Sequence, residues 1–287
     1  MSAHASLSLD ERRRRPLRER VTTLSAYLVL FVGAIVTLFP FAWMLLTSLK
    51  PFAELFTLAF LPSEPTLENY RTVLGQTAFV RWFVNSLLVA GVTTLSVLFF
   101  DSLVGYTLAK FDFPGKTLIF VAILSTLMIP TEMLVIPWFV GVVDLKLTNT
   151  YFSILFPGLM SAFGIFLMRQ FFETVPSDLI EAARIDGMNE FGIFWKVALP
   201  LVRPALASLA IFTFLGNWNA FLWPLVVIQS PALRTLPVGV ALFSGEAGTQ
   251  WGLIMAASSL AVIPVLLVFA FFQRQIIEGI VMTGMKG

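Results

Sequence analysis

The chain has 287 residues, of which 57% are hydrophobic and 13% are charged, and its mean hydropathy is +0.86. The charged fraction is about half that of a soluble domain, so the composition excludes an ordinary soluble protein and predicts an integral membrane protein. A formal net charge of +2 is too small to indicate nucleic-acid binding. The chain has no cysteine, and its one histidine, His4, lies in a polar tail. This argues against a disulfide framework, a thiol nucleophile or a metal centre.

An apolar run follows the basic N-terminal tail, residues 1–23. The tail contains six arginines: Arg12, Arg13, Arg14, Arg15, Arg18 and Arg20. We interpret that run as a retained first span and not as a signal peptide, because no small-residue cleavage site interrupts it. Six segments are apolar for long enough to cross a ~30 Å hydrocarbon core. They cover residues 24–46, 83–109, 117–143, 151–168, 206–228 and 253–272. The sequence therefore predicts an all-α polytopic membrane protein with a single domain over residues 24–287.

Glycine and proline recur inside these segments, for example at Pro130, Pro157, Gly216 and Pro224. Proline removes a helix hydrogen bond and kinks the helix, and broken helices at membrane depth occur only beside protein or a water-filled cavity. This pattern favours a transporter over a simple anchor. A clear internal repeat, common in self-sufficient secondary carriers, is not evident in the sequence.

The longest charge-bearing interruption is residues 175–204, VPSDLIEAARIDGMNEFGIFWKVALPLVRP. Asp178 and Glu181 have the spacing of a capping box, and Gly187 can supply the left-handed residue that ends a helix. The pattern predicts a helix of about two and a half turns outside the membrane. Four apolar residues of this helix form a small face between charged flanks, which suits docking against another protein: Leu179, Ala182, Ala183 and Ile185.

The triplet Glu181-Ala182-Ala183, followed by Asp186-Gly187 and the closing Leu199-Pro200, resembles the EAA loop of ABC-importer permeases. The run from Gly216 to Pro224 and the C-terminal run from Gln273 are similar to the carbohydrate, MalG-type branch of that family. The C-terminal run has Met285 where that branch usually has Ala-Val before the final Lys-Gly. The resemblance implies a six-span permease in which the EAA helix is the cytoplasmic coupling helix. It assigns ATPase docking to Glu181, Ala182, Ala183, Asp186 and Gly187.

The resemblance also implies the partners. They are a second, MalF-like permease subunit, two copies of a cytoplasmic ATPase that bind ATP and Mg²⁺, and an extracytoplasmic sugar-binding protein, all at the lipid bilayer. This chain would be no enzyme and would hold no cofactor. Gly115-Lys116-Thr117 is not a phosphate loop, because Lys110 stands where that motif needs its first glycine.

Six spans place both termini on the same side of the membrane. That side carries 14 of the 19 lysines and arginines, and the other side carries Lys50, Arg71, Arg81, Lys146 and Arg234. The positive-inside rule then puts the termini and residues 175–204 in the cytoplasm. We expect the chain in the cytoplasmic membrane of a bacterium or archaeon.

Polar and aromatic side chains inside the spans are candidates for a sugar path: Asn217, Trp218, Asn219, Trp223 and Glu132. Carboxamides donate and accept hydrogen bonds, and an indole can stack on a pyranose. Asn217 and Asn219 lie about 200° apart on a helix, so both face one path only if the helix is distorted. Alternatively, the tryptophans form an interfacial belt and the amides join helices. The predicted spans hold no lysine or arginine in their interiors, which favours a neutral saccharide.

Asp101 lies nine residues before Lys110, ~13 Å along a helix, where a charge is costly unless it faces the protein interior. Glu132 follows a proline and could instead cap a restarted helix. Two interpretations stay open at this point. Asp101 pairs structurally with a neighbouring helix, or Asp101 and Glu132 serve a proton- or cation-coupled secondary carrier.

Overall fold

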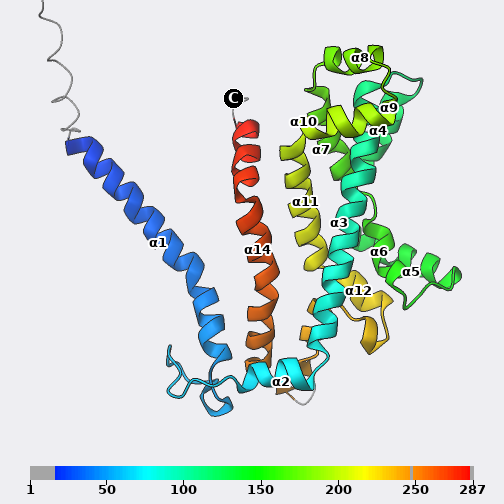
Figure 1. Ribbon diagram of the computed structural model, residues 1–287. Helices are drawn as coiled ribbons and strands as arrows, with labels where there is room; N and C mark the ends of the chain where they lie inside the picture. The colour runs from blue at the N-terminus through cyan, green and yellow to red at the C-terminus, as the bar shows by residue number, and fades with distance from the viewer. Residues whose placement is uncertain (1–16, 246–247, 285–287) are drawn as a thin grey trace, which may run out of the picture.

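The computed structural model describes residues 17–245 and 248–284, and most of these are helical (Figure 1). Three helices are long and apolar enough to cross a membrane unaided: α1 (Leu17–Ser48), α3 (Phe79–Lys110) and α14 (Trp251–Gly284). Three bent helix pairs also qualify, so the described residues hold up to six spans if each pair counts as one. The predicted all-α polytopic architecture is confirmed.

Each bent pair joins two helical pieces across a short break. The first pair, bent by 92°, joins α4 (Lys116–Thr126) to η2 (Thr131–Leu134) and α5 (Val135–Asp144). The second, bent by 43°, joins α6 (Tyr151–Leu155) and η3 (Phe156–Gly158) to α7 (Ala162–Glu173). The third, bent by 84°, joins α9 (Glu190–Ile193), the π-helical turn η4 (Phe194–Ala198) and α10 (Leu199–Leu201) to α11 (Arg203–Trp218).

Three predicted spans are not single straight helices. The span over 151–168 is broken between η3 and α7. The span over 117–143 bends sharply just before η2, where Pro130 adopts an extended ψ of 130°. The span over 206–228 stops at Trp218 and restarts as α12 (Leu222–Val227). Pro224 lies in the first turn of α12, where its missing N–H costs no helix hydrogen bond, so the restart of the helix accommodates the proline. The first helix begins at Leu17, seven residues before the predicted start, and Arg12–Arg15 lie outside the described residues.

The remaining elements connect the spans. The region after α1 holds η1 (Phe52–Glu54) and α2 (Glu68–Gln76). Between α12 and α14 lie η5 (Pro231–Leu233), α13 (Leu236–Ala241) and a small antiparallel hairpin of β1 (Ser244–Gly245) and β2 (Gly248–Thr249). The sequence analysis did not predict the hairpin.

Helix α3 lies at the centre of the bundle, where it packs against α7 and α11. Helix α1 diverges from the bundle toward its N-terminal end (Figure 1), and its most apolar stretch has no buried part. At the other end of α1, the Tyr70 hydroxyl forms hydrogen bonds with Ser48 Oγ at 2.7 Å and Ser259 Oγ at 2.9 Å. This pair of bonds ties α1, α2 and α14 together on the side of the molecule opposite the loop over 175–204.

Candidate functional site

Helix α8 (Ser177–Ile185) lies across one end of the bundle, outside the spans (Figure 1). The segment before it is attached to α3, because Lys110 Nζ donates a hydrogen bond to the Val175 carbonyl at 2.5 Å. The helix has nine residues, the length that the sequence predicted. Its position makes α8 accessible from beyond the end of the bundle.

The start of α8 differs from the prediction. Pro176 occupies the N-cap with φ −58° and ψ 131°, and no side chain caps the helix. The predicted capping box of Asp178 and Glu181 is therefore wrong. Because helix formation begins immediately after the proline, Asp178 lies in the first turn, where its charge still complements the helix dipole.

The end of α8 agrees with the prediction that Gly187 terminates it. Gly187 has φ +79°, in the left-handed region. Its N–H donates to the Arg184 carbonyl, and the Met188 N–H donates to the Ala183 carbonyl, both at 3.0 Å. These two bonds form a Schellman motif, which satisfies carbonyls that the end of a helix would otherwise leave unpaired.

Two faces of α8 have different environments. Ile180 and Ala183 are 2% and 8% exposed and belong to the same hydrophobic cluster as Tyr106 of α3. The opposite face is open to solvent: Leu179, Glu181, Ala182, Ile185 and Asp186. Ala183 was predicted on the exposed apolar face, and that placement is wrong, because Ala183 shares the inward side with Ile180 three residues earlier. Leu179, Ala182 and Ile185 are exposed as predicted.

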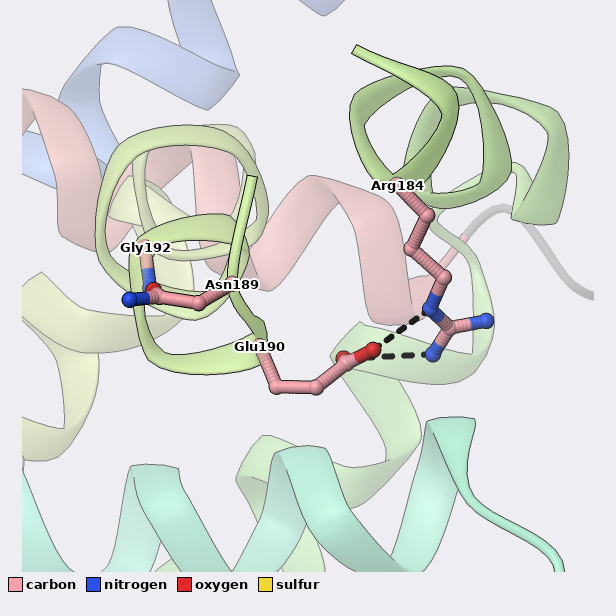
Figure 2. A network of polar contacts seen from close by, with 4 residues as sticks. All are labelled: Arg184, Asn189, Glu190 and Gly192. Carbon is pink, nitrogen blue, oxygen red and sulfur yellow. Dashed lines mark hydrogen bonds and ion pairs between the residues drawn. The ribbon is translucent and has the colours of Figure 1, made fainter. Parts of the chain in front are cut away.

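A bidentate ion pair spans the turn after α8 (Figure 2). Arg184 Nε donates to Glu190 Oε1 at 2.6 Å and Nη2 donates to Glu190 Oε2 at 3.2 Å. The hydrogen bond to Glu190 raises the pKa of the Arg184 guanidinium above its ordinary value. Such exposed pairs contribute only about 0.2–1 kcal/mol to stability, but two parallel bonds also define the orientation of the groups they join.

The Arg184–Glu190 pair was missed at the sequence level. The sequence feature that could have indicated this pair is two opposite charges, six residues apart, on either side of the turn at Gly187. Beside it, Asn189 Oδ1 accepts a hydrogen bond from the Gly192 N–H at 2.7 Å and caps α9 (Figure 2). The ion pair joins α9 to α8, and the cap stabilises the start of α9.

The loop leaves this end of the bundle through η4 and α10. In η4 the Leu199 N–H bonds to the Phe194 carbonyl five residues back, and Pro200 follows at the start of α10. Val202, with φ −105° and ψ 21°, ends the helical run before α11 starts. Residues 177–201 therefore lie across the end of the bundle, while α11 runs into it at 84°.

Two of the predicted path residues, one buried and one half-buried, make contacts within the subunit. Trp218 is 2% exposed, donates its indole N–H to the Ala261 carbonyl at 3.2 Å, and packs edge-on against Phe83. Asn217 lies close to η3, because a Cβ built on Gly158 would meet Asn217 Oδ1 at 3.2 Å. Trp218 is therefore interior packing and not part of an interfacial belt. The half-buried Asn217 donates its amide N–H to the Thr213 carbonyl of its own helix at 2.9 Å.

The other three predicted path residues are at least partly exposed to solvent. Asn219 is exposed and donates one N–H to the Leu215 carbonyl at 2.9 Å. Trp223 is half-buried and donates its indole N–H to the Ser153 carbonyl at 2.9 Å. Glu132 is exposed in the first turn of η2, directly after the 92° bend, and no side chain caps that helix.

Asp101 has a structural environment. Its side chain is 0% exposed and accepts hydrogen bonds from the Ser161 N–H, at 3.2 and 3.1 Å, and from Ser161 Oγ at 2.7 Å. Ser161 Oγ in turn accepts from the Gly164 N–H at 2.9 Å and caps α7. Asp101 thus fastens the break before α7 to α3, as the structural interpretation expects.

Comparisons with known proteins agree with the EAA resemblance. The model of the family "Binding-protein-dependent transport system inner membrane component" matches residues 101–281. The chain is 37% identical over 282 residues to the arabinooligosaccharides transport system permease protein AraQ of Halalkalibacterium halodurans, covering 96% of this chain and 100% of AraQ. It is 33% identical over 263 residues to the lactose transport system permease protein LacG of Rhizobium radiobacter, covering 92% and 96%.

A solved structure also matches over most of the chain. It belongs to a bacterial ABC transporter involved in the import of the acidic polysaccharide alginate, with TM-score 0.82 and 26% identity over 91% of this chain and 98% of that chain. The family match covers more than half of the chain and includes the whole of residues 175–204. The chain therefore belongs to the family of binding-protein-dependent transport system inner membrane components, the permease subunits of ABC importers.

Proposed function

We propose that this permease subunit moves a neutral sugar or oligosaccharide across the cytoplasmic membrane. The names of AraQ and LacG, which refer to arabino-oligosaccharides and lactose, support a saccharide. The charges near the spans support a neutral one. Arg169 lies one turn from the end of α7 and pairs with Glu173 at 2.8 Å, so it offers little free positive charge to an acidic substrate.

The observation that carries the proposal is the construction of α8, which has one open face and one face anchored in the bundle. We assign ATPase docking to the open face, with Glu181, Ala182, Asp186 and Gly187 presented to the partner. Ala183 and Ile180 lie on the opposite, buried face of α8, where they pack against the bundle. Because Ile180 and Ala183 share a hydrophobic cluster with residues of α3 and α7, a displacement of α8 would move those helices with it.

The coupling scheme follows from this arrangement. Two copies of the ATPase would bind ATP and Mg²⁺, close on one another and pull on α8 and on its counterpart in a second permease subunit. The two subunits would then rock between inward-facing and outward-facing states around a shared path. An extracytoplasmic binding protein would deliver the sugar. The distribution of basic residues supports both termini and α8 in the cytoplasm.

We assign Asn219, Trp223 and Glu132 to the sugar path. We leave out Trp218 because it is buried, and Asn217 because its amide bonds to the Thr213 carbonyl and lies close to Gly158. Asn219 is the best placed of the three for direct contact, because it is exposed on α11 where that helix ends. A carboxamide at that place can donate to and accept from sugar hydroxyls.

Uptake by the reconstituted importer tests the proposed substrate class. Liposomes would contain the full complex, and the probes would be labelled arabinotriose, lactose and glycerol 3-phosphate. We expect ATP-dependent uptake of a saccharide and none of the phosphate ester. Asn219→Ala should raise the sugar concentration for half-maximal uptake about two- to tenfold, the equivalent of one hydrogen bond, while sugar-independent ATPase activity persists.

Trp218→Ala is the matched control, because it removes a packing residue one position away and should lower the yield of assembled complex instead. Uptake of the phosphate ester alone would contradict the neutral-sugar proposal. Uptake that continues without ATP would contradict the ATP-driven mechanism.

A further inference from the structure

One face of α11 is covered in the first half of the helix and open in the second half. Ala205 and Leu209 are 0% exposed and lie in the same hydrophobic cluster as Met168 of α7. Farther along, three residues are exposed: Phe212, Gly216 and Asn219. At about 100° per residue, the four α11 positions and Asn219, which caps the end of α11, fall within about 80° of one another, so they lie on a single face.

The second half of this α11 face is open because its neighbour, α7, does not extend along it. Helix α7 begins at Ala162, after the 43° bend that takes the preceding chain in another direction. Phe163 in its first turn packs its ring edge-on against Phe212 at a centroid distance of 6.3 Å. Beyond that contact, a Cβ built on Gly216 meets nothing within 4 Å. We call this open region the α11 notch, formed by Phe163, Phe212, Gly216 and Asn219.

The α11 notch lies at membrane depth. Counting from Arg203 at the start of α11, Phe212 is ~14 Å and Asn219 ~24 Å along the helix, inside a hydrocarbon core of ~30 Å. An exposed carboxamide at that depth is costly against lipid, so the face it lies on belongs against protein or water. Two aromatic rings beside a carboxamide and an empty glycine position match a neutral saccharide, which has apolar ring faces and a rim of hydroxyls.

We propose that the α11 notch is the wall that this subunit contributes to the water-filled sugar path, and that the absent side chain of Gly216 sets the width of the path. This inference rests on the proposed sugar-import function and adds Phe163, Phe212 and Gly216 to the residues that face the substrate. Neither packing nor backbone conformation explains the glycine, because its surroundings are open and its φ is not left-handed. The competing role is close packing of a partner helix against Gly216.

A single cysteine tests the proposal, because the natural chain has none. Gly216→Cys would be assembled into the full importer in liposomes and treated with sulfonatoethyl methanethiosulfonate, a charged reagent that modifies thiols in contact with water. Gly33→Cys is the matched control, since Gly33 is also exposed, also has open space at its Cβ, and lies in α1. Gly216→Ala shows whether the helix accepts any side chain at this position.

We expect Gly216→Cys to be modified in the nucleotide-free or the ATP-bound state, and the modified importer to lose most of its sugar uptake while keeping sugar-independent ATPase activity. Gly33→Cys should stay unmodified. Gly216→Ala should assemble and transport, but more slowly than the parent, because its methyl group narrows the path. Failure of Gly216→Cys to react in both states, or modification without loss of uptake, would overturn the proposal. If the parent importer takes up no saccharide, the sugar function fails, and the labelling still reports whether the α11 notch faces water.

Discussion

Replacing Gly187 with valine should abolish transport while the chain still inserts and accumulates in the membrane. Gly187 has φ +79°, a conformation that costs a β-branched residue roughly 1–2 kcal/mol or more. To escape that strain the turn would have to give up the two Schellman hydrogen bonds and reorient Arg184 relative to Glu190. ATP-dependent uptake and membrane content of the variant are the quantities to measure.

Gly115 provides a matched control for strain alone. It has φ +86° and open space around its Cβ, but it lies in the turn before α4. Gly115→Val should therefore retain uptake, and Gly187→Asn should retain much of it, because asparagine tolerates the left-handed region. Parent-level uptake by Gly187→Val, or equal loss in Gly115→Val, would contradict a specific role for the turn after α8.

Replacing Asp101 with leucine should greatly reduce the amount of folded, assembled permease. The Ser161 N–H and hydroxyl would lose their buried acceptor, and an unsatisfied buried donor costs about 1–3 kcal/mol. Asp101→Asn keeps one carbonyl oxygen as an acceptor and should preserve most of the assembly and uptake. Thermal unfolding of the detergent-purified complex would measure the difference between the two variants.

The same residue separates the ATP-driven mechanism from a proton-coupled carrier. If Asp101 is structural, a protonophore should leave ATP-driven uptake unchanged in the parent and in Asp101→Asn. The carrier alternative requires the opposite result, which is parent uptake that follows the proton gradient in vesicles without ATP and disappears in Asp101→Asn.

Features governed by local chemistry were predictable from the sequence. Charged residues bound the long apolar runs, so the predicted spans over 83–109 and 253–272 fall within α3 and α14. Gly187 could be predicted as the end of the helix over 177–185, because few residue types other than glycine accept a positive φ. Pro130 indicated a break, but a proline does not determine how far the chain turns, and the 92° bend depends on contacts between distant segments.

Features that depend on neighbours could not be predicted. Which side of α8 faces the bundle decides that Ala183 is covered and Ile185 is 86% exposed, and the helical period alone does not select that side. The separation of Asn217 from Asn219 followed from helix geometry. That Asn219 would be the open one depends on where α7 begins, which the sequence of α11 does not contain.

Crosslinking from the open face of α8 tests the central claim most directly. Ile185→Cys, modified with benzophenone-4-maleimide in the assembled importer, places a photoreactive group on the most exposed apolar position of α8, and Asp112→Cys places it on the neighbouring exposed turn. The account predicts that illumination links the ATPase to the Ile185→Cys permease and not to the Asp112→Cys permease. No ATPase adduct from Ile185→Cys, or equal adducts from both positions, would contradict docking through α8.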